Sequence, residues 1–234
     1  MTSSTLFKLT RWAGVSSALL TGIAMLLYPG GTLRDPSTSG YSFFQNSLSD
    51  LGSTVAWGGQ ENSRGAWFFL CGCAILAIAG IACFVTLVHV YSSSPPTRWV
   101  ARTAGVAGLF SCAALLGVAL MPGDRHPALH GQFTLLALGA LLVAILLFAL
   151  ATALDDRFPR RVPFGWLALT LVLVAWMSVM RWPPTTDLQL TIPVTLQKTV
   201  ALAVLVIFYF QSYEAERAVT PQTGWLRNRG SLGD

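Results

Sequence analysis

The chain has 234 residues, of which 53% are hydrophobic and only 11% charged, and its formal net charge is +5. Soluble domains carry about 25% charged residues, whereas the mean hydropathy of this chain is +0.59. This composition excludes a disordered chain, a coiled coil and an ordinary soluble enzyme, and it indicates a polytopic membrane protein.

Six stretches of the sequence are long and apolar enough to cross a bilayer as helices, because a hydrocarbon core of about 30 Å needs about 20 apolar residues. None of them carries an ionisable residue near its middle. The sequence therefore predicts an all-α fold, a bundle of six transmembrane helices that forms one domain over residues 1–218, followed by a mobile tail over 219–234. The six spans cover about 12–28, 66–91, 100–121, 132–154, 164–182 and 193–213.

Small residues recur four apart along the third span. Ala101 and Gly105 form one such pair, Ala104 and Gly108 another, and the pattern continues toward Gly117. Spacings of this kind allow helix backbones to approach closely in a membrane. We therefore expect the third helix to be the central, most enclosed one.

The loops on the two sides of the membrane differ in positive charge. Six spans place both termini on one side, and the segments on that side hold ten Lys and Arg residues against five on the other. By the positive-inside rule both termini are cytoplasmic, which places the protein in a bacterial-type inner or plasma membrane. This topology, together with attraction to anionic lipid head groups, accounts for the basic charge, so no nucleic-acid partner is expected.

The first outer loop, residues 29–65, is the longest connection in the chain. Its apolar residues recur at intervals of three and four, which is typical of one stripe of a short helix, and Gly52 follows where a helix often ends. We predict a helix over about 41–51 on the outer leaflet, either as a cap on the bundle or as a lid over a site. The residues of the stripe are Tyr41, Phe44, Leu48 and Leu51.

Polar and charged residues gather on the same outer side, in this loop, in the turn after the third span and around the last loop. Lys198 is the most deeply embedded charge, and a basic residue at such a depth normally snorkels to the interface or pairs with an acid. The candidate ligand-binding residues are Asn46, Ser49, Asp50, Asp124, His130, Arg181 and Lys198.

Two hypotheses describe how these residues meet. In the first, the outer loop folds over the turn at 122–130 and brings Asp50 within reach of His130 or Arg125. In the second, Arg181 and Lys198, which flank the loop at 183–192, bind an anionic head group or a carboxylate beside Asp50 and His130. The alternative to the second hypothesis is that these two cations only anchor their helices at head-group depth.

A metal site formed by Asp124, His126 and His130 is an alternative use of the turn, because a helix places histidines four apart on one face and zinc takes three or four ligands. The third histidine, His89, lies about 35 Å away along its helix, which excludes a three-histidine intramembrane hydrolase. The alternative to this metal site is that Asp124 caps the fourth helix and His130 forms a hydrogen bond with a loop group. No cofactor is expected.

Several other classes of protein lack support. The middles of the spans are apolar and no proline interrupts them, whereas ion-coupled transporters need ionisable groups or broken helices there. The chain also contains no nucleophile elbow, P-loop or dinucleotide-binding fingerprint.

The segment Asn46-Ser47-Leu48-Ser49-Asp50-Leu51-Gly52 resembles the N-x-I-S-D/E-L-G segment that follows the first span in domain-of-unknown-function family 998, a family of six-helix bacterial and archaeal membrane proteins. Pro122-x-Asp124 followed by His130 is similar to the F-P-x-D turn and later histidine of that family, with Met121 in place of the usual aromatic residue. The resemblance covers the six spans but not the tail, and DRAM/Frag-type membrane proteins are a more distant look-alike. It implies a fold and a position for a site, not a reaction.

Two functional classes follow. The first is a binding protein or enzyme whose outward-facing polar site takes a lipid head group or a small polar ligand. The second is a structural or accessory subunit that packs against a larger membrane complex. Membrane lipids are the expected partners, together with other membrane protein subunits in the second class. Convergence of Asn46, Asp50, Asp124 and His130 on one cavity favours the first class, and separate bonding of each to backbone groups favours the second.

The charge asymmetry generates a prediction about topology. A reporter fused after Asp234 should be active on the cytoplasmic side, and a cysteine introduced at Ser39 should react with an impermeant maleimide added to intact cells. The opposite labelling pattern would reverse the orientation and place the proposed site in the cytoplasm.

Overall fold

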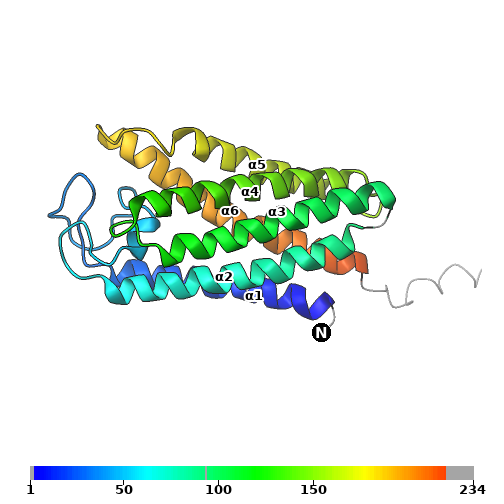
Figure 1. Cartoon of the computed structure of the whole chain (residues 1–234), viewed down its shortest axis with the longest axis horizontal. Helices are drawn as coiled ribbons and strands as arrows, with labels where there is room; N and C mark the ends of the chain where they lie inside the picture. Colours follow the sequence, from blue (N-terminus) through cyan, green and yellow to red (C-terminus); the bar gives the residue numbers. More distant parts are fainter. Residues whose placement is uncertain (1–2, 93, 220–234) are drawn as a thin grey trace, which may run out of the picture.

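The computed structural model describes residues 3–92 and 94–219, which form six long helices running back and forth along one axis (Figure 1). All six are long and apolar enough to cross a membrane, and the described ranges contain no β-strand, only two isolated bridges. The predicted all-α six-helix fold is confirmed. The elements are α1 (Ser3–Leu27), the 3-10 helix η1 (Ser49–Gly52), α2 (Ser63–Val90), α3 (Pro95–Leu120), α4 (Pro127–Ala153), α5 (Arg161–Val179) and α6 (Asp187–Val219).

Most helices begin several residues before the apolar spans. The difference matters most for Pro193, which the sequence reading placed at the start of the last helix, whereas α6 begins at Asp187 and contains Pro193. The start is set by a capping box, because Thr186 Oγ1 accepts the N–H of Gln189 at 3.2 Å and Gln189 Oε1 accepts the N–H of Thr186 at 3.2 Å. Apart from Val219, the tail predicted to be mobile lies outside the described residues.

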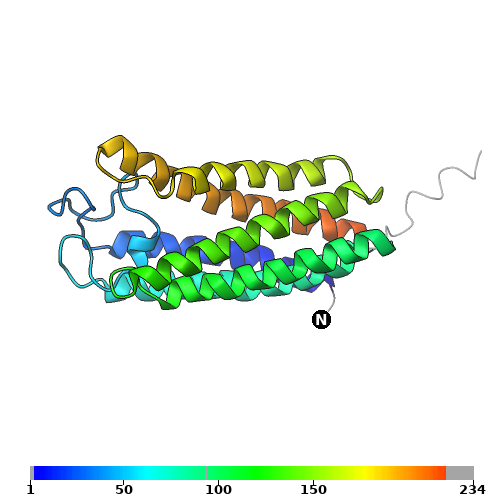
Figure 2. The ribbon, with the colours of Figure 1, turned by 45° about the horizontal axis from the view of Figure 1, so that its top comes forward.

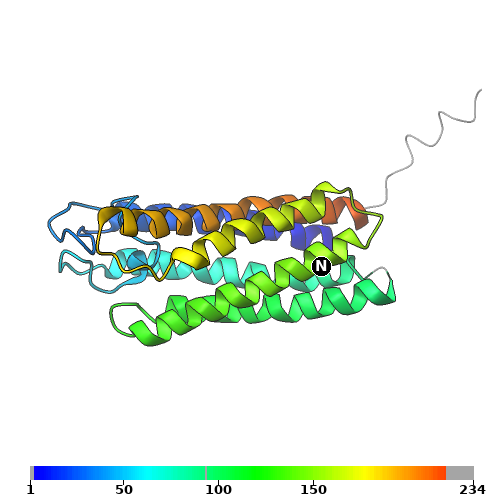
Figure 3. The ribbon, with the colours of Figure 1, turned by 90° about the horizontal axis from the view of Figure 1, so that it is seen from above.

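The helices form a closed ring in chain order. Each helix packs against the helix before it and the helix after it, and α6 closes the ring by packing against α1. Figure 3 shows α6 running beside α1, with α3 on the opposite side of the bundle. The third helix is not central, because α3 packs mainly on α2 and α4 as a member of the ring. Its expected enclosure is confirmed, since 39% of its apolar window is buried, as large a share as in any of the six helices.

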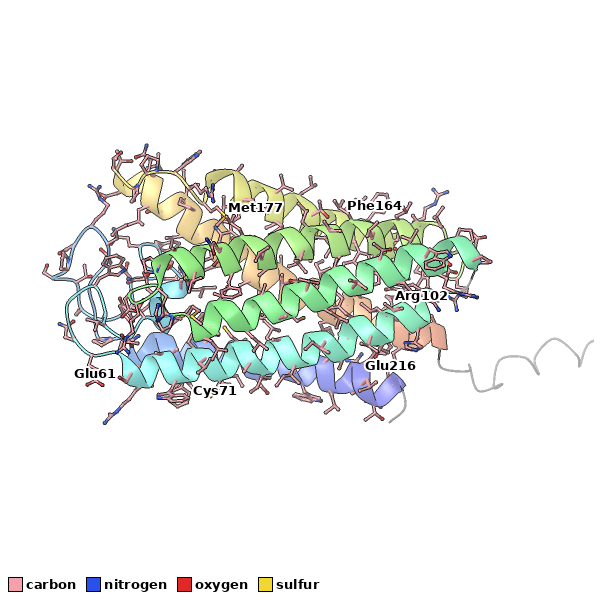
Figure 4. The ribbon with its side chains drawn as sticks, in the orientation of Figure 1. Glu61, Cys71, Arg102, Phe164, Met177 and Glu216 are labelled. Carbon is pink, nitrogen blue, oxygen red and sulfur yellow. The ribbon has the colours of Figure 1, made fainter. Side chains whose placement is uncertain are left out.

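The two ends of the bundle carry different segments of the chain. The cap end carries residues 28–62, the α3–α4 turn and the α5–α6 loop, and the terminal end carries the first residues of α1 and the last residues of α6 (Figure 2). Glu61 lies at the cap end and Glu216 at the terminal end (Figure 4). Between the ends, side chains such as Cys71 and Phe164 are exposed on the lateral surface, as expected for helices that face lipid.

Aromatic side chains from four helices fill the interior on the α5 side. The rings of Phe84 and Phe148 stack at 6.0 Å between centroids, Phe148 stacks on Trp166 at 5.7 Å, and Phe208 meets both Phe84 and Trp166 edge to face. Offset and edge-to-face pairs of this kind each contribute about 0.5–1.5 kcal/mol beyond their area burial. The cluster therefore joins α2, α4, α5 and α6 across the ring.

An apolar cavity of about 560 Å³ lies beside α1 and is open to the lateral surface, since the exposed side chains of Leu19 and Tyr209 line it. Phe84 and Phe208 form one wall, Gly14 and Ala18 of α1 another, and Arg11 lies at its border. The seam between α1 and α6, which borders this space, is the least extensive contact between neighbouring helices of the ring.

Ion pairs tie the helices together at the terminal end. Arg11 of α1 bonds to Glu216 of α6 at 2.6 Å, and Arg161 of α5 bonds to Glu214 of α6 at 3.0 Å. Arg157 bonds to Asp155 at 2.7 Å and also donates to the carbonyl of Val90 at 2.6 Å. The hydrogen bond that Arg157 donates to Asp155 is the main cause that raises the pKa of the Arg157 guanidinium. The pairs of Glu216 and Glu214 hold α6 to both of its neighbours.

Close packing of α3 on α2 depends on a glycine. A Cβ added at Gly108 would lie 2.5 Å from the ring of Phe84, whereas a Cβ at Gly139 of α4 would meet nothing within 4 Å. Small residues on α3 thus let the aromatic cluster reach the helix backbone, as their spacing predicted.

We expect Gly108→Ala to destabilise the fold by about 1–3 kcal/mol, because overpacking outweighs the gain in helix propensity. Gly139→Ala is the matched control and should leave the melting temperature unchanged or raise it. Thermal unfolding of both variants in detergent checks this, and equal melting temperatures would contradict the assigned packing.

Candidate functional site

Residues 28–62 fold into a compact cap over the end of the bundle rather than lying flat as a helix. The predicted helix over 41–51 is wrong, because residues 41–48 form turns and only the 3-10 helix η1, Ser49–Gly52, is helical. Of the predicted stripe, Leu51 is fully buried against Tyr28 and Phe69. Phe44, by contrast, is exposed.

Side-chain hydrogen bonds explain why the helix does not form. Asn46 is fully buried, its Oδ1 accepts the N–H of Ser42 at 2.9 Å, and its Nδ2 donates to the carbonyl of Gly31 at 2.9 Å. Side chains of Asn and Ser that bond to nearby backbone groups compete with helical hydrogen bonds. Asn46 therefore fixes a turn where the apolar spacing alone predicted a helix.

Asp50 completes this turn. Its carboxylate accepts the N–H and the hydroxyl of Ser47, each at 2.9 Å, and the Nδ2 of Asn46 at 3.1 Å. Asp50 thus bonds within its own loop, and the prediction that it reaches His130 or Arg125 is wrong.

Lys198 anchors the cap to α6. Its ammonium donates to the carbonyl of Asn46 at 2.6 Å and lies 5.4 Å and 5.0 Å from the ring centroids of Tyr41 and Phe43. Burial raises the pKa of the Tyr41 phenol, so its hydroxyl stays protonated and donates to the same carbonyl at 3.0 Å. The partner of this embedded cation is a main-chain oxygen and two aromatic faces, not one of the outer aspartates.

The cap does fold over the α3–α4 turn, through Thr54. The hydroxyl of Thr54 donates to Asp124 at 2.6 Å, and the backbone N–H groups of Thr54 and Val55 donate to the same carboxylate. Arg125 donates to the Thr54 hydroxyl at 3.0 Å. Asp124 therefore fastens the cap and does not cap α4, which has no side-chain cap.

Electrostatics at Asp124 follow from these bonds. Burial alone would raise the pKa of the carboxyl, but the hydrogen bonds from Thr54 and Val55 stabilise the charged form and hold the pKa below its ordinary value. The contact between cap and turn therefore depends on the ionised carboxylate.

A second contact between the cap and α4 joins Ser49 to His130. The Nδ1 of His130 lies 2.8 Å from the carbonyl oxygen of Met121, and its Nε2 lies 3.1 Å from the Oγ of Ser49. A carbonyl oxygen only accepts, so Nδ1 carries the hydrogen and, in the neutral ring, Nε2 accepts from the serine hydroxyl. The two segments that carry the family resemblance meet at this pair.

Ser49 and His130 face a pocket of about 380 Å³ between the cap, α4, α5 and α6. One part of its lining is polar and includes Thr134, Gln189 and Gln197 besides the pair. The other part is apolar. Its larger members are Leu33, Trp176, Met180, Trp182, Leu190 and Val194.

The seven predicted site residues therefore separate into three groups. Ser49 and His130 line the pocket. Asn46, Asp50, Asp124 and Lys198 hold the cap in place from outside the pocket wall. Arg181 is exposed just beyond α5 and does not line the pocket, whereas Lys198 is buried under the cap.

Sequence reasoning missed two contributors. Arg34 pairs with Asp187 at 2.6 Å and donates to the carbonyls of Pro184 and Thr185, which closes the cap against the α5–α6 loop. Gln197 accepts the N–H of Leu48 at 2.8 Å through its Oε1. Arg34 could have been noticed in the sequence, since it is a charge in the longest loop, whereas Gln197, a single amide within the apolar part of α6, could not.

The alternative metal site of Asp124, His126 and His130 does not form. Asp124 is bonded to Thr54, and His130 uses both ring nitrogens for Met121 and Ser49. Throughout residues 3–92 and 94–219, no three His, Cys, Asp or Glu side chains gather in a way that could hold a metal ion.

A ring of six apolar helices with a folded cap at one end defines a multi-pass integral membrane protein. The chain belongs to the family described as protein of unknown function (DUF998), which matches residues 22–211. Comparisons with curated proteins and with solved structures find no match. The predicted family is confirmed, and it covers the cap, the pocket and all of α2 to α5.

The anchoring role of Lys198 can be tested with Lys198→Met, which keeps the side-chain length but removes the donor. Because a buried carbonyl loses a partner, we expect a loss of about 1–3 kcal/mol in stability. The control is Arg181→Met, an exposed cation at the same end, which should melt like the unmodified protein. Equal melting temperatures in detergent would show that Lys198 does not hold the cap.

The Asp124 contact predicts a pH dependence. A lowered folded-state pKa contributes stability that is fully present above the unfolded value of about 3.9 and is lost as pH falls through the folded pKa. Asp124→Asn should therefore lower the melting temperature at pH 6, and its difference from the unmodified protein should shrink toward pH 3. Asp156→Asn, an exposed residue at the terminal end, should show no such trend.

Proposed function

We propose that the pocket beside Ser49 and His130 is an outward-facing site that binds a lipid head group or a small polar ligand. The observation that carries the proposal is the pocket itself, in which hydroxyl, imidazole and amide groups face one volume of about 380 Å³ at the cap end of the bundle. Pockets with a few convergent polar groups on apolar walls are the usual form of small-molecule sites.

The division of the lining supports an amphipathic ligand. Gln189 and Gln197 present amide groups, while Trp176, Met180 and Val194 present apolar surface. The pocket lies where the helices end, and tryptophan is enriched where membrane meets water. A molecule with one polar and one apolar part suits such a wall better than a free ion.

Pro193, which lies inside α6, bears on the polar groups of the pocket. It has no N–H, so the carbonyl of Gln189 has no helical donor four residues later. Both residues line the pocket, where a hydroxyl or amine of the ligand can donate to this carbonyl.

The orientation of the site follows from the charge asymmetry. With ten basic residues on the side of the termini, the cap end faces away from the cytoplasm of a bacterial-type inner or plasma membrane. The ligand then enters from outside the cell or from the outer leaflet.

An accessory subunit of a larger membrane complex is the second candidate. It is favoured by the convergence criterion, because only His130 of the four residues Asn46, Asp50, Asp124 and His130 lines the pocket, while the other three bond to groups of the cap. In this case the cap is a rigid surface for a partner subunit, and the pocket is not occupied by a ligand.

Filling the pocket separates the two candidates. Gly131 lines the pocket and has nothing within 4 Å of an added Cβ, and Gly139, two turns further along α4, is equally open but does not line it. We expect Gly131→Trp to lower the amount of phosphatidylglycerol or phosphatidylethanolamine retained per protein, because the new ring occupies the ligand volume.

Native mass spectrometry of protein released from nanodiscs of these two lipids measures the retention, with Gly139→Trp as the matched control. Equal retention by Gly131→Trp, Gly139→Trp and the unmodified chain would contradict a lipid site and favour the accessory-subunit role.

A further inference from the structure

We propose that Ser49 and His130 form a nucleophile–base pair that cleaves a carboxylic ester held in this pocket. The inference rests on the proposed binding function and names its substrate class. It is carried by the geometry of one serine, one histidine and one backbone carbonyl at the wall of an amphipathic pocket.

The histidine is set up to act as the base. The carbonyl of Met121 accepts the Nδ1 hydrogen at 2.8 Å, which leaves the lone pair of Nε2 directed at the Ser49 hydroxyl 3.1 Å away. An activated serine needs a base within hydrogen-bond reach and a third group that orients the base. Here the main chain at the end of α3 supplies the third group, where many hydrolases use a carboxylate.

The serine is held firmly. Ser49 is the first residue of the 3-10 helix η1. The buried side chain of Leu51 and the turn formed by Asp50 hold this helix in place. Both Ser49 and His130 are half-buried and line the pocket. A ligand in the pocket therefore reaches the hydroxyl without any movement of the cap.

Gln197 is the candidate donor for the developing oxyanion. Its Oε1 accepts the N–H of Leu48, the residue before Ser49, at 2.8 Å. This bond fixes the amide plane and leaves the two hydrogens of Nε2 for a group in the pocket. A fixed donor beside the nucleophile is the usual means of stabilising a tetrahedral intermediate.

The ester class follows from the position and lining of the pocket. Ester linkages of glycerolipids lie between the polar head group and the acyl chains, and this pocket joins polar groups to apolar walls at the ends of the helices. Serine activated by histidine is also a nucleophile suited to acyl carbonyl carbon.

The reaction balances with water as the only co-reactant. Ser49 Oγ attacks the carbonyl carbon while its proton passes to Nε2 of His130. The ester C–O bond then breaks, and the same proton passes to the leaving alkoxide oxygen. Water attacks the acyl-serine, gives one proton to His130, and releases a carboxylic acid as that proton returns to Ser49.

A fluorophosphonate probe with an alkyl chain tests the pair in the full chain in nanodiscs, because such probes react with activated serines. We expect a single addition by intact mass, mapped to Ser49 by peptide analysis. Ser49→Ala should not react. His130→Gln should react about 10²–10⁴-fold more slowly, and His126→Gln, an exposed histidine outside the pocket, should react like the unmodified protein.

Two substrates distinguish the source of the ester. Release of fatty acid from phosphatidylglycerol in the nanodisc indicates a membrane lipid, and cleavage of p-nitrophenyl butyrate alone indicates a soluble ester. Either activity should be lost in Ser49→Ala.

The proposal is overturned if the unmodified protein is not labelled at Ser49, or if His130→Gln is labelled at the same rate. If Ser49→Ala does not fold, the comparison of labelling rates between the unmodified protein and His130→Gln still tests the proposal. If lipid retention still differs between Gly131→Trp and Gly139→Trp, the pocket binds without cleaving and only the catalytic proposal fails. If that difference is also absent, the binding function fails with it.

Discussion

The cap depends on one buried hydrogen bond, from the ammonium of Lys198 to the carbonyl of Asn46. Close to the hydrocarbon region, a charge is costly to bury unless polar groups satisfy it, and the Asn46 carbonyl, which also accepts the Tyr41 hydroxyl, is the group that satisfies Lys198. Once this bond places Asn46, the Asn46 side chain fixes the turn, Asp50 closes it, and Ser49 follows at the start of η1. Lys198 of α6 thus determines where this wall of the pocket lies, although Lys198 and Asn46 are 152 residues apart in the sequence.

The six helices were predictable because the bilayer imposes their length and composition, and hydropathy records both. The cap was not, because short-range side-chain bonds decide its shape. The spacing of Tyr41, Phe44 and Leu48 gives the period of a helix, yet Asn46 and Ser47 offer the backbone nearer partners than helical carbonyls. The start of α6 was readable in principle, since Thr186 and Gln189 have the spacing of a capping box.

The candidate site was predicted in part, for a related reason. Sequence placed Ser49 and His130 on the same side of the membrane, because topology alone determines that. It did not identify which polar residues would bond to each other, since Asp50, the obvious partner for a histidine, is used by Ser47. Every residue has a main-chain carbonyl, so the sequence does not show which carbonyl a side chain will bond to. The bonds to the carbonyls of Asn46 and Met121 are therefore seen only in the fold.

Closure of the ring in chain order has a consequence for biogenesis. Each of α2 to α6 can dock on the helix inserted just before it, so five of the six seams form between neighbours as the chain leaves the ribosome. Only the seam between α1 and α6 joins segments from opposite ends of synthesis. The Arg11–Glu216 pair at its terminal end therefore forms in the last assembly step, when α6 meets α1.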